Sequence, residues 1–136
     1  MKNPKTTSVL VGLGLMVVLA YGYAQGRPVV TNYSTNTFIN DTGQAAGGLH
    51  IEYNTVGIAA VYQNPANTFA DGQLEGNESI LSLSSGTVAA GGSVQIKVST
   101  WQAPVRNIFK WWWTDGNGNI VGQAHKGCRN PDCTGP

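Results

Sequence analysis

The side chains that could carry out acid–base or nucleophilic chemistry are few. His50 and His125 are the only histidines of the 136-residue chain. No serine stands in the G-x-S-x-G turn that exposes a nucleophile, and no glycine-rich segment has the form of a phosphate-binding loop that opens a helix. We therefore predict a protein that is not an enzyme and that needs no cofactor. A small secreted enzyme would instead require a pocket that unites His50 with a carboxylate and a nucleophile.

Oxygen-bearing side chains are spaced in two places as hard-cation ligands are. The stretch that begins at Asp115 does not form an EF-hand loop, because it lacks a glycine at the sixth position and a glutamate at the twelfth. Its Asp-Gly-Asn-Gly residues are equally explained as a turn that needs positive φ angles. We expect no bound metal. The candidate calcium ligands are Asp71, Glu75 and Glu78 in one stretch and Asp115, Asn117 and Asn119 in the other.

The two cysteines, Cys128 and Cys133, lie close together near the end of the chain. The intervening Asn130-Pro131-Asp132 favours a turn that brings the two sulfur atoms together. Two thiols with His125 do not make a plausible zinc set, so a disulfide is the better interpretation. Because the closed loop is short, its entropic contribution is about 2 kcal/mol, and we expect the bridge to hold the tail in place rather than to support the whole fold.

Tryptophan is the most unusual feature of the composition. Trp111, Trp112 and Trp113 are consecutive, and Trp101 precedes them by ten positions. Successive side chains of a strand point to opposite faces, so Trp111 and Trp113 share one face and Trp112 takes the other. An indole left outside the core could stack on a sugar or contact a neighbouring subunit. The alternative is that these side chains all pack within their own domain.

The first 24 residues have the pattern of a secretory leader. Lys2 and Lys5 precede an apolar run at residues 9–20, and Gly22 and Ala24 supply the small residues before a cleavage point. The run is shorter than the roughly 20 residues that cross a bilayer. We predict a leader helix that is removed after Ala24 or is retained as an anchor, and a secreted or cell-surface location. Export also makes three N-x-[ST] sites candidates for glycosylation, at Asn32, Asn40 and Asn77.

The charge balance limits the partners of the chain. Eight lysines and arginines face seven acidic residues, for a net charge of +1, and Lys2 and Lys5 both belong to the leader. No basic field is left that would attract nucleic acid or an anionic lipid surface. We therefore expect no nucleic-acid partner, and contact with a membrane only through an uncleaved leader.

Short β-prone segments alternate with turn signals along the rest of the chain. Apolar residues occupy every second position at residues 49–53 and 94–98, and β-prone runs occur at residues 29–33, 37–39, 57–62, 79–84, 108–114 and 120–124. The stretch from 64 to 77 reads as irregular. No apolar set recurs with a helical period. This rhythm predicts an all-β antiparallel sandwich of seven or eight strands that follows the leader helix.

Three segments carry a resemblance to a known type of domain: NDTGQAAGGLHIEY, SLSSGTVAAGGSVQIKV and WWWTDGNGNIVG. Together they resemble small secreted β-sandwich domains of poorly characterised microbial surface proteins, over residues 37–123. The resemblance implies an immunoglobulin-like fold and a surface-layer, adhesive or fibre-forming role, with no catalytic residues to carry over.

The expected organisation is a signal peptide at 1–24, a β-prone arm with the first strands at 25–47, a sandwich core at 48–125 and a disulfide-containing tail at 126–136. The arm, residues 28–39, could pair with its own sheet or be donated to a neighbouring copy. We therefore predict a non-catalytic surface protein whose partner is another copy, in an extracellular filament built by strand exchange. The alternative is a carbohydrate- or surface-binding module that uses Trp101 and Trp112 on surface glycans.

Overall fold

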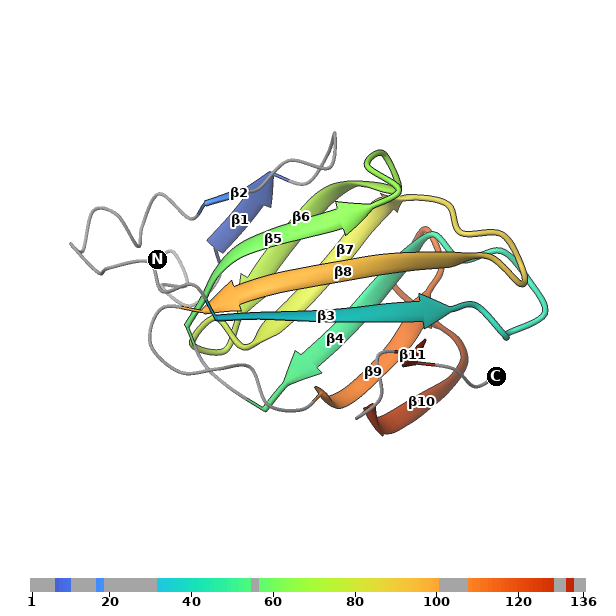
Figure 1. Cartoon of the computed structure of the whole chain (residues 1–136). Helices are drawn as coiled ribbons and strands as arrows, with labels where there is room; N and C mark the ends of the chain where they lie inside the picture. The colour runs from blue at the N-terminus through green and yellow to red at the C-terminus, as the bar shows by residue number, and fades with distance from the viewer. Residues whose placement is uncertain are drawn as a thin grey trace.

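The computed structural model describes residues 7–10, 17–18, 32–54, 57–100, 108–128 and 132–133. Within these ranges the protein is all-β, with eleven strands and no helix (Figure 1). The strands are β1 (Thr7–Leu10), β2 (Val17–Val18), β3 (Asn32–Ile39), β4 (Gly48–Tyr53), β5 (Ile58–Asn64), β6 (Phe69–Glu75), β7 (Ile80–Gly86), β8 (Ser93–Thr100), β9 (Ile108–Thr114), β10 (Ile120–Cys128) and β11 (Asp132–Cys133).

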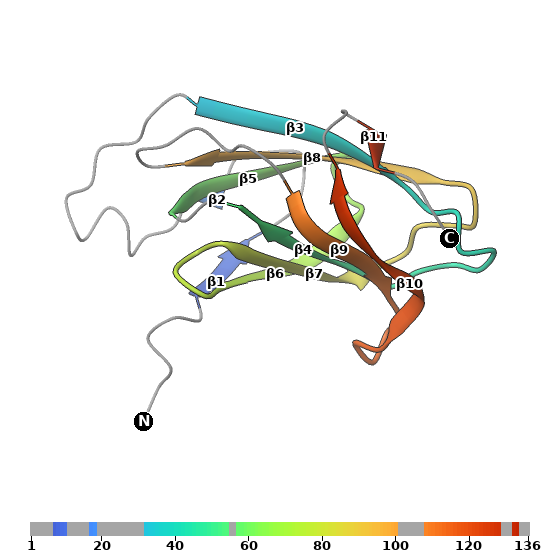
Figure 2. The same cartoon turned by 90° about the horizontal axis from the view of Figure 1, so that it is seen from below.

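The strands form two sheets that face each other as a β-sandwich (Figure 2). The large sheet has the order β1-β6-β7-β4-β9-β10, and all its neighbours are antiparallel. The small sheet has the order β11-β3-β8-β5-β2, in which only β11 and β3 run parallel. The hairpins β6–β7 and β9–β10 stay within the large sheet. Apart from the β6–β7 hairpin, every connection between consecutive strands from β3 to β9 runs from one sheet to the other. These connections hold the apolar faces of the two sheets together.

Period-two alternation fills the space between the sheets. In β4, Leu49, Ile51 and Tyr53 are buried, and Val94, Ile96 and Val98 of β8 are buried opposite them. Removing these side chains from water is the main favourable term in folding. The polar residues that alternate with them lie on the two outer faces. Polar side chains that could bind a ligand therefore lie on two separate outer faces.

The tryptophan run follows the same rule. Trp111 and Trp113 of β9 are completely buried, whereas Trp112 is half-buried on the outer face of the large sheet. The ring of Trp111 makes edge contacts with Phe38, at 5.2 Å between ring centroids, and with Trp113, at 6.3 Å. The predicted division of the three indoles between two faces is confirmed.

The predicted sandwich is confirmed, and the eight strands from β3 to β10 match the expected number. Two predictions about single segments are corrected. Residues 32–33, the described end of the first β-prone run, and the run at 37–39 belong to one continuous strand, β3. The stretch from 64 to 77 is not irregular, because it contains β6. The Asp71-Gly72 pair that reads as a turn lies inside β6, where Gly72 is buried beside Leu83 of β7.

The leader helix is not confirmed. Of the predicted leader, the structure describes only Thr7–Leu10 and Val17–Val18, and both are strands. β1 pairs with β6 at the edge of the large sheet, and β2 pairs with β5 at the edge of the small sheet. The cleavage point after Ala24 lies outside the described residues.

Candidate functional site

The outer face of the small sheet carries a cluster of two tyrosines and one lysine. Because Val94, Ile96 and Val98 face the core, Lys97 of β8 must point outward. In the register of the sheet, Lys97 lies opposite Tyr62 of β5. Its ammonium group lies 4.4 Å from the ring centroid of Tyr33 and 5.0 Å from that of Tyr62. This arrangement is a cation–π contact with two rings.

The two tyrosine rings of this cluster also contact each other. Their centroids are 6.2 Å apart in an edge-to-face arrangement, and Tyr33 is 46% exposed. Burial, together with a hydrogen bond to Tyr33 and the charge of that residue, raises the pKa of Tyr62. The Tyr62 hydroxyl group therefore remains a protonated donor at neutral pH. The cluster thus offers aromatic surface, hydroxyl groups and a positive charge in one place.

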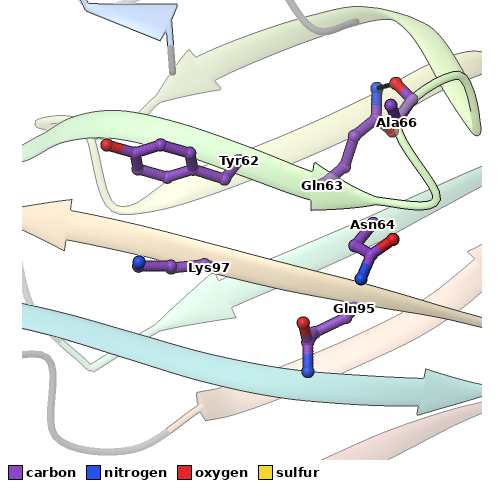
Figure 3. Close-up of a pocket in the computed structure, with 6 residues that line it drawn as sticks. All are labelled: Tyr62, Gln63, Asn64, Ala66, Gln95 and Lys97. Carbon is purple, nitrogen blue, oxygen red and sulfur yellow. Dashed lines mark hydrogen bonds between the residues drawn. The ribbon is translucent and has the colours of Figure 1, made fainter. Parts of the chain in front are cut away.

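A pocket of about 300 Å³ opens beside this cluster (Figure 3). In Figure 3, Tyr62 and Lys97 lie side by side, while Gln63 turns away from them towards Ala66. The side-chain amides of Asn64 and Gln95 lie on paired positions of β5 and β8 and make no hydrogen bond within the described residues. The pocket is lined by Tyr62, Gln63, Asn64, Ala66, Gln95 and Lys97.

Electrostatics single out Lys97. It is the only charged side chain on β3, β5 and β8, and no ion pair within the described ranges involves it. The other outward side chains of these strands are uncharged. Within the described residues, no ion pair engages the Lys97 ammonium group, so an anion that entered the pocket could bind to it.

The outer face of the large sheet carries a second cluster, around His50 of β4. Its Nδ1 lies 3.2 Å from the hydroxyl oxygen of Ser82, its Nε2 lies 2.9 Å from a carboxylate oxygen of Glu52, and its ring stacks on Trp112 at 4.1 Å. The register of the sheet brings these side chains together, because His50 is paired with Ser82 of β7 on one side and with Trp112 of β9 on the other. The cluster thus unites a hydroxyl, an imidazole and a carboxylate, as a catalytic triad does.

The backbone around His50 does not supply the rest of such a site. β4 is paired on one side with β7 and on the other with β9, so its N–H groups belong to the sheet ladders. Acyl transfer needs free donors that stabilise a developing oxyanion, and the paired N–H groups of β4 are not free to act as such donors. The expectation that the chain is not an enzyme remains a prediction. Within the cluster, the His50 ring covers one face of the Trp112 indole.

The predicted tryptophan contacts divide into three cases. Trp111 and Trp113 are wrong as surface contacts, because they are buried in the core and expose no area to a partner. Trp112 is at the surface, but His50 covers one of its faces. Trp101 lies outside the described residues, so its pairing with Trp112 stays a prediction.

The three candidate glycosylation sites have different environments. Asn40 is wrong as an acceptor, because it is completely buried and its amide donates to the carbonyl oxygens of Gln44, Val88 and Ala89. Its side-chain oxygen accepts a hydrogen bond from the Thr42 hydroxyl within the same N-x-T triplet. Asn77 is exposed in the β6–β7 turn. Asn32 begins β3, and its side chain is not among those described.

The candidate calcium ligands are held by other interactions or lie apart. The Asp115 carboxylate accepts hydrogen bonds from the backbone N–H groups of Asn117 and Asn119, at 2.8 and 2.9 Å, and these bonds lower its pKa. They close the β9–β10 hairpin loop. Asp71 and Glu75 point outward from β6, whereas Glu78 is buried in the turn that follows. In the described part of the chain, no three acidic, histidine or cysteine side chains gather as metal ligands do.

The predicted disulfide between Cys128 and Cys133 is present. Cys128 ends β10 in the large sheet, and Cys133 lies in β11, which pairs with β3 in the small sheet. Cys133 is buried within the hydrophobic core. The bridge therefore joins the two sheets as well as holding the tail.

The sequence alone does not predict Tyr33, Tyr62 and Lys97 as residues of a functional site. The alternation at residues 94–98 places Lys97 outward, and this is the one signal that points to it. The pairing of β8 with β3 and β5, which brings the two tyrosines to this lysine, is set by the register of the sheet.

The described residues contain no helix that is long enough and apolar enough to cross a membrane. Comparison of the chain with models of protein families, with curated proteins and with solved structures finds no match.

Proposed function

We propose that the chain is a non-catalytic structural protein of the cell exterior that assembles by accepting a strand from another copy. One observation carries the proposal. β5 and β6, which follow each other in the chain, are each paired at their outer edge with a short strand from the predicted leader. The sandwich thus has room for added strands along this side.

Removal of the leader would change these two strands. β1 pairs with β6 at four positions from Thr7 to Leu10, and β2 pairs with β5 at Val17 and Val18. Without residues 1–24, β5 and β6 become edge strands whose outward N–H and C=O groups are open to another chain. An extended apolar segment would satisfy these groups by strand addition.

The donor is the part of the arm that precedes β3. Asn32–Ile39 pairs with β8 along its whole length, and Phe38 is buried in the core, so this segment is an integral strand of its own sheet. Residues 28–31 lie outside the described ranges. We propose that residues 25–31, which include Val29 and Val30, supply the strand that is donated.

The arrangement of strands also bears on the proposed kinship with immunoglobulin-like surface domains. With β3 to β9 taken as strands A to G, the five strands β4 to β8 keep the immunoglobulin order, B-E-D in one sheet and C-F in the other. In an immunoglobulin domain, strand A lies in the sheet of strand B and strand G in the sheet of strand F. Here β3 (A) lies beside β8 (F) and β9 (G) lies beside β4 (B), so strands A and G have exchanged sheets. We propose an immunoglobulin-related sandwich with this exchange, of the kind that builds microbial surfaces.

The test compares three chains: residues 1–136, residues 25–136 and residues 32–136. Sedimentation and electron microscopy should show fibres only for residues 25–136, because only this chain has both open edges and a donor. A chain of residues 25–136 that stays monomeric at every concentration would overturn the proposal. Equal polymerisation of residues 32–136 would show that the donor is wrongly assigned.

A further inference from the structure

We propose that the pocket beside Tyr62 and Lys97 binds an acidic sugar unit, a pyranose ring with a carboxylate, within an extracellular polysaccharide. The site lies on the outer face of the small sheet, whereas strand addition takes place at its edge. The proposal therefore does not depend on the assembly proposed above, and either one can fail while the other stands.

The aromatic part of the site is exposed and held in place. Tyr33 and Tyr62 lie edge to face, with centroids 6.2 Å apart, and both contact the Lys97 side chain. Tyrosine offers a large apolar ring at a low entropic cost, together with a hydroxyl that can bind a polar group. The C–H face of a pyranose ring and its hydroxyl groups match these two properties.

The charge of the site selects the sugar. Lys97 is the only charged residue on the three strands β3, β5 and β8, and within the described residues it has no carboxylate partner. Its contacts with both tyrosine rings favour one position of the ammonium group, which lowers the entropic cost of binding a ligand there. A sugar carboxylate would form a charge-assisted hydrogen bond there.

The remaining lining residues suit sugar hydroxyl groups. The amides of Asn64 and Gln95 lie on paired positions of neighbouring strands, and each offers both donors and an acceptor. Gln63 is committed to the backbone of Ala66 and Phe69 and helps to keep the wall rigid. A volume of about 300 Å³ is at the small end of ligand pockets, which suits a single ring of a longer chain.

The probe is polygalacturonate, with its fully methyl-esterified form as the matched ligand control. The ester keeps every sugar ring and removes the negative charge. Calorimetric titration of the chain should show binding of polygalacturonate that weakens with added salt, and binding of the ester that is weaker by about tenfold or more. Equal binding of the two polymers, or no binding of either, would overturn the proposal.

Variants locate the site. Lys97→Gln should weaken polygalacturonate binding by about tenfold and remove most of the difference between the two polymers. Tyr62→Phe should keep most of the affinity and Tyr62→Ala should lose it, because the ring supplies the stacking surface. Thermal unfolding of each variant verifies that the sandwich is intact.

The matched control is Lys110→Gln. Lys110 also lies near an aromatic ring, 5.7 Å from the centroid of Phe109, but it belongs to β9 in the large sheet. This variant should bind polygalacturonate as the unchanged protein does. If it weakens binding as much as Lys97→Gln, the attraction is a general effect of positive charge and the pocket is not the site.

Discussion

The buried side chain of Gln63 makes the hydrogen bonds that strand pairing would otherwise supply to the backbone of Ala66 and Phe69. It is 3% exposed, and its amide nitrogen donates to the carbonyl oxygens of Ala66 and Phe69, both at 2.8 Å. Its amide oxygen accepts from the Phe69 N–H group at 2.9 Å. These bonds lie where the chain leaves the small sheet and enters the large one. A single side chain therefore satisfies three backbone groups of this crossing.

Replacement of Gln63 by methionine should destabilise the protein by about 2 kcal/mol. The new side chain has a similar shape, but one buried N–H group and two carbonyl oxygens lose their partner. Gln95→Met is the control, since Gln95 is exposed and makes no hydrogen bond within the described residues. Urea unfolding of the two variants measures the difference. Equal stabilities would show that water replaces the lost bonds.

At the scale of elements, the contact between the end of β7 and the start of β6 leaves no room for a side chain. Gly86 pairs with Phe69, and a Cβ atom at Gly86 would overlap the carbonyl oxygen of Thr68. The obstacle is backbone, which cannot move aside as a flexible side chain can. The two strands of the β6–β7 hairpin approach this closely only because the residue is glycine.

The variant Gly86→Ala should lose about 2 kcal/mol of stability or more, because the hairpin must shift to accept the methyl group. Gly116→Ala is its control. Gly116 lies in the β9–β10 loop, where a Cβ atom meets nothing within 4 Å and the φ angle is not positive. Thermal unfolding should separate the two variants clearly, and a Gly86→Ala protein as stable as the control would contradict the packing at this contact.

Most strands could be predicted because their residues alternate with a period of two. β8 shows the cleanest pattern, with Val94, Ile96 and Val98 facing inward. β6 could not be predicted from the sequence, because Asp71-Gly72 has the composition of a turn. This segment is a strand because it pairs with β7 on one side and with β1 on the other. Local pattern thus predicts an element only where local and tertiary preferences agree.

The candidate site shows the same limit. Lys97 could be placed on an outer face from alternation, but its neighbours Tyr33 and Tyr62 are distant in sequence. Only the pairing of β3 and β5 on either side of β8 brings them together. Alternation predicts which face a residue occupies, whereas strand order and register, which decide its neighbours, depend on long-range packing.

For the whole molecule, the disulfide contributes by joining the last strand to both sheets. The double variant Cys128→Ser/Cys133→Ser should unfold with a free energy about 2 kcal/mol lower than the unchanged protein, because the closed loop is short. Reductant should lower the stability of the unchanged protein to that of the variant and leave the variant unaffected. A larger loss on reduction than in the variant would show that free thiols disturb the core around Cys133.

The parallel pairing of β3 with β11 has a mechanical consequence. If the protein is held by segments before Asn32 and after Cys133, tension pulls these two strands in opposite directions along their own axes. Hydrogen bonds loaded in shear must break together, unlike those of a hairpin that is unzipped one by one. The disulfide passes part of the same load to β10. In the fibre proposed above, each subunit would therefore resist being pulled apart when the fibre is stretched.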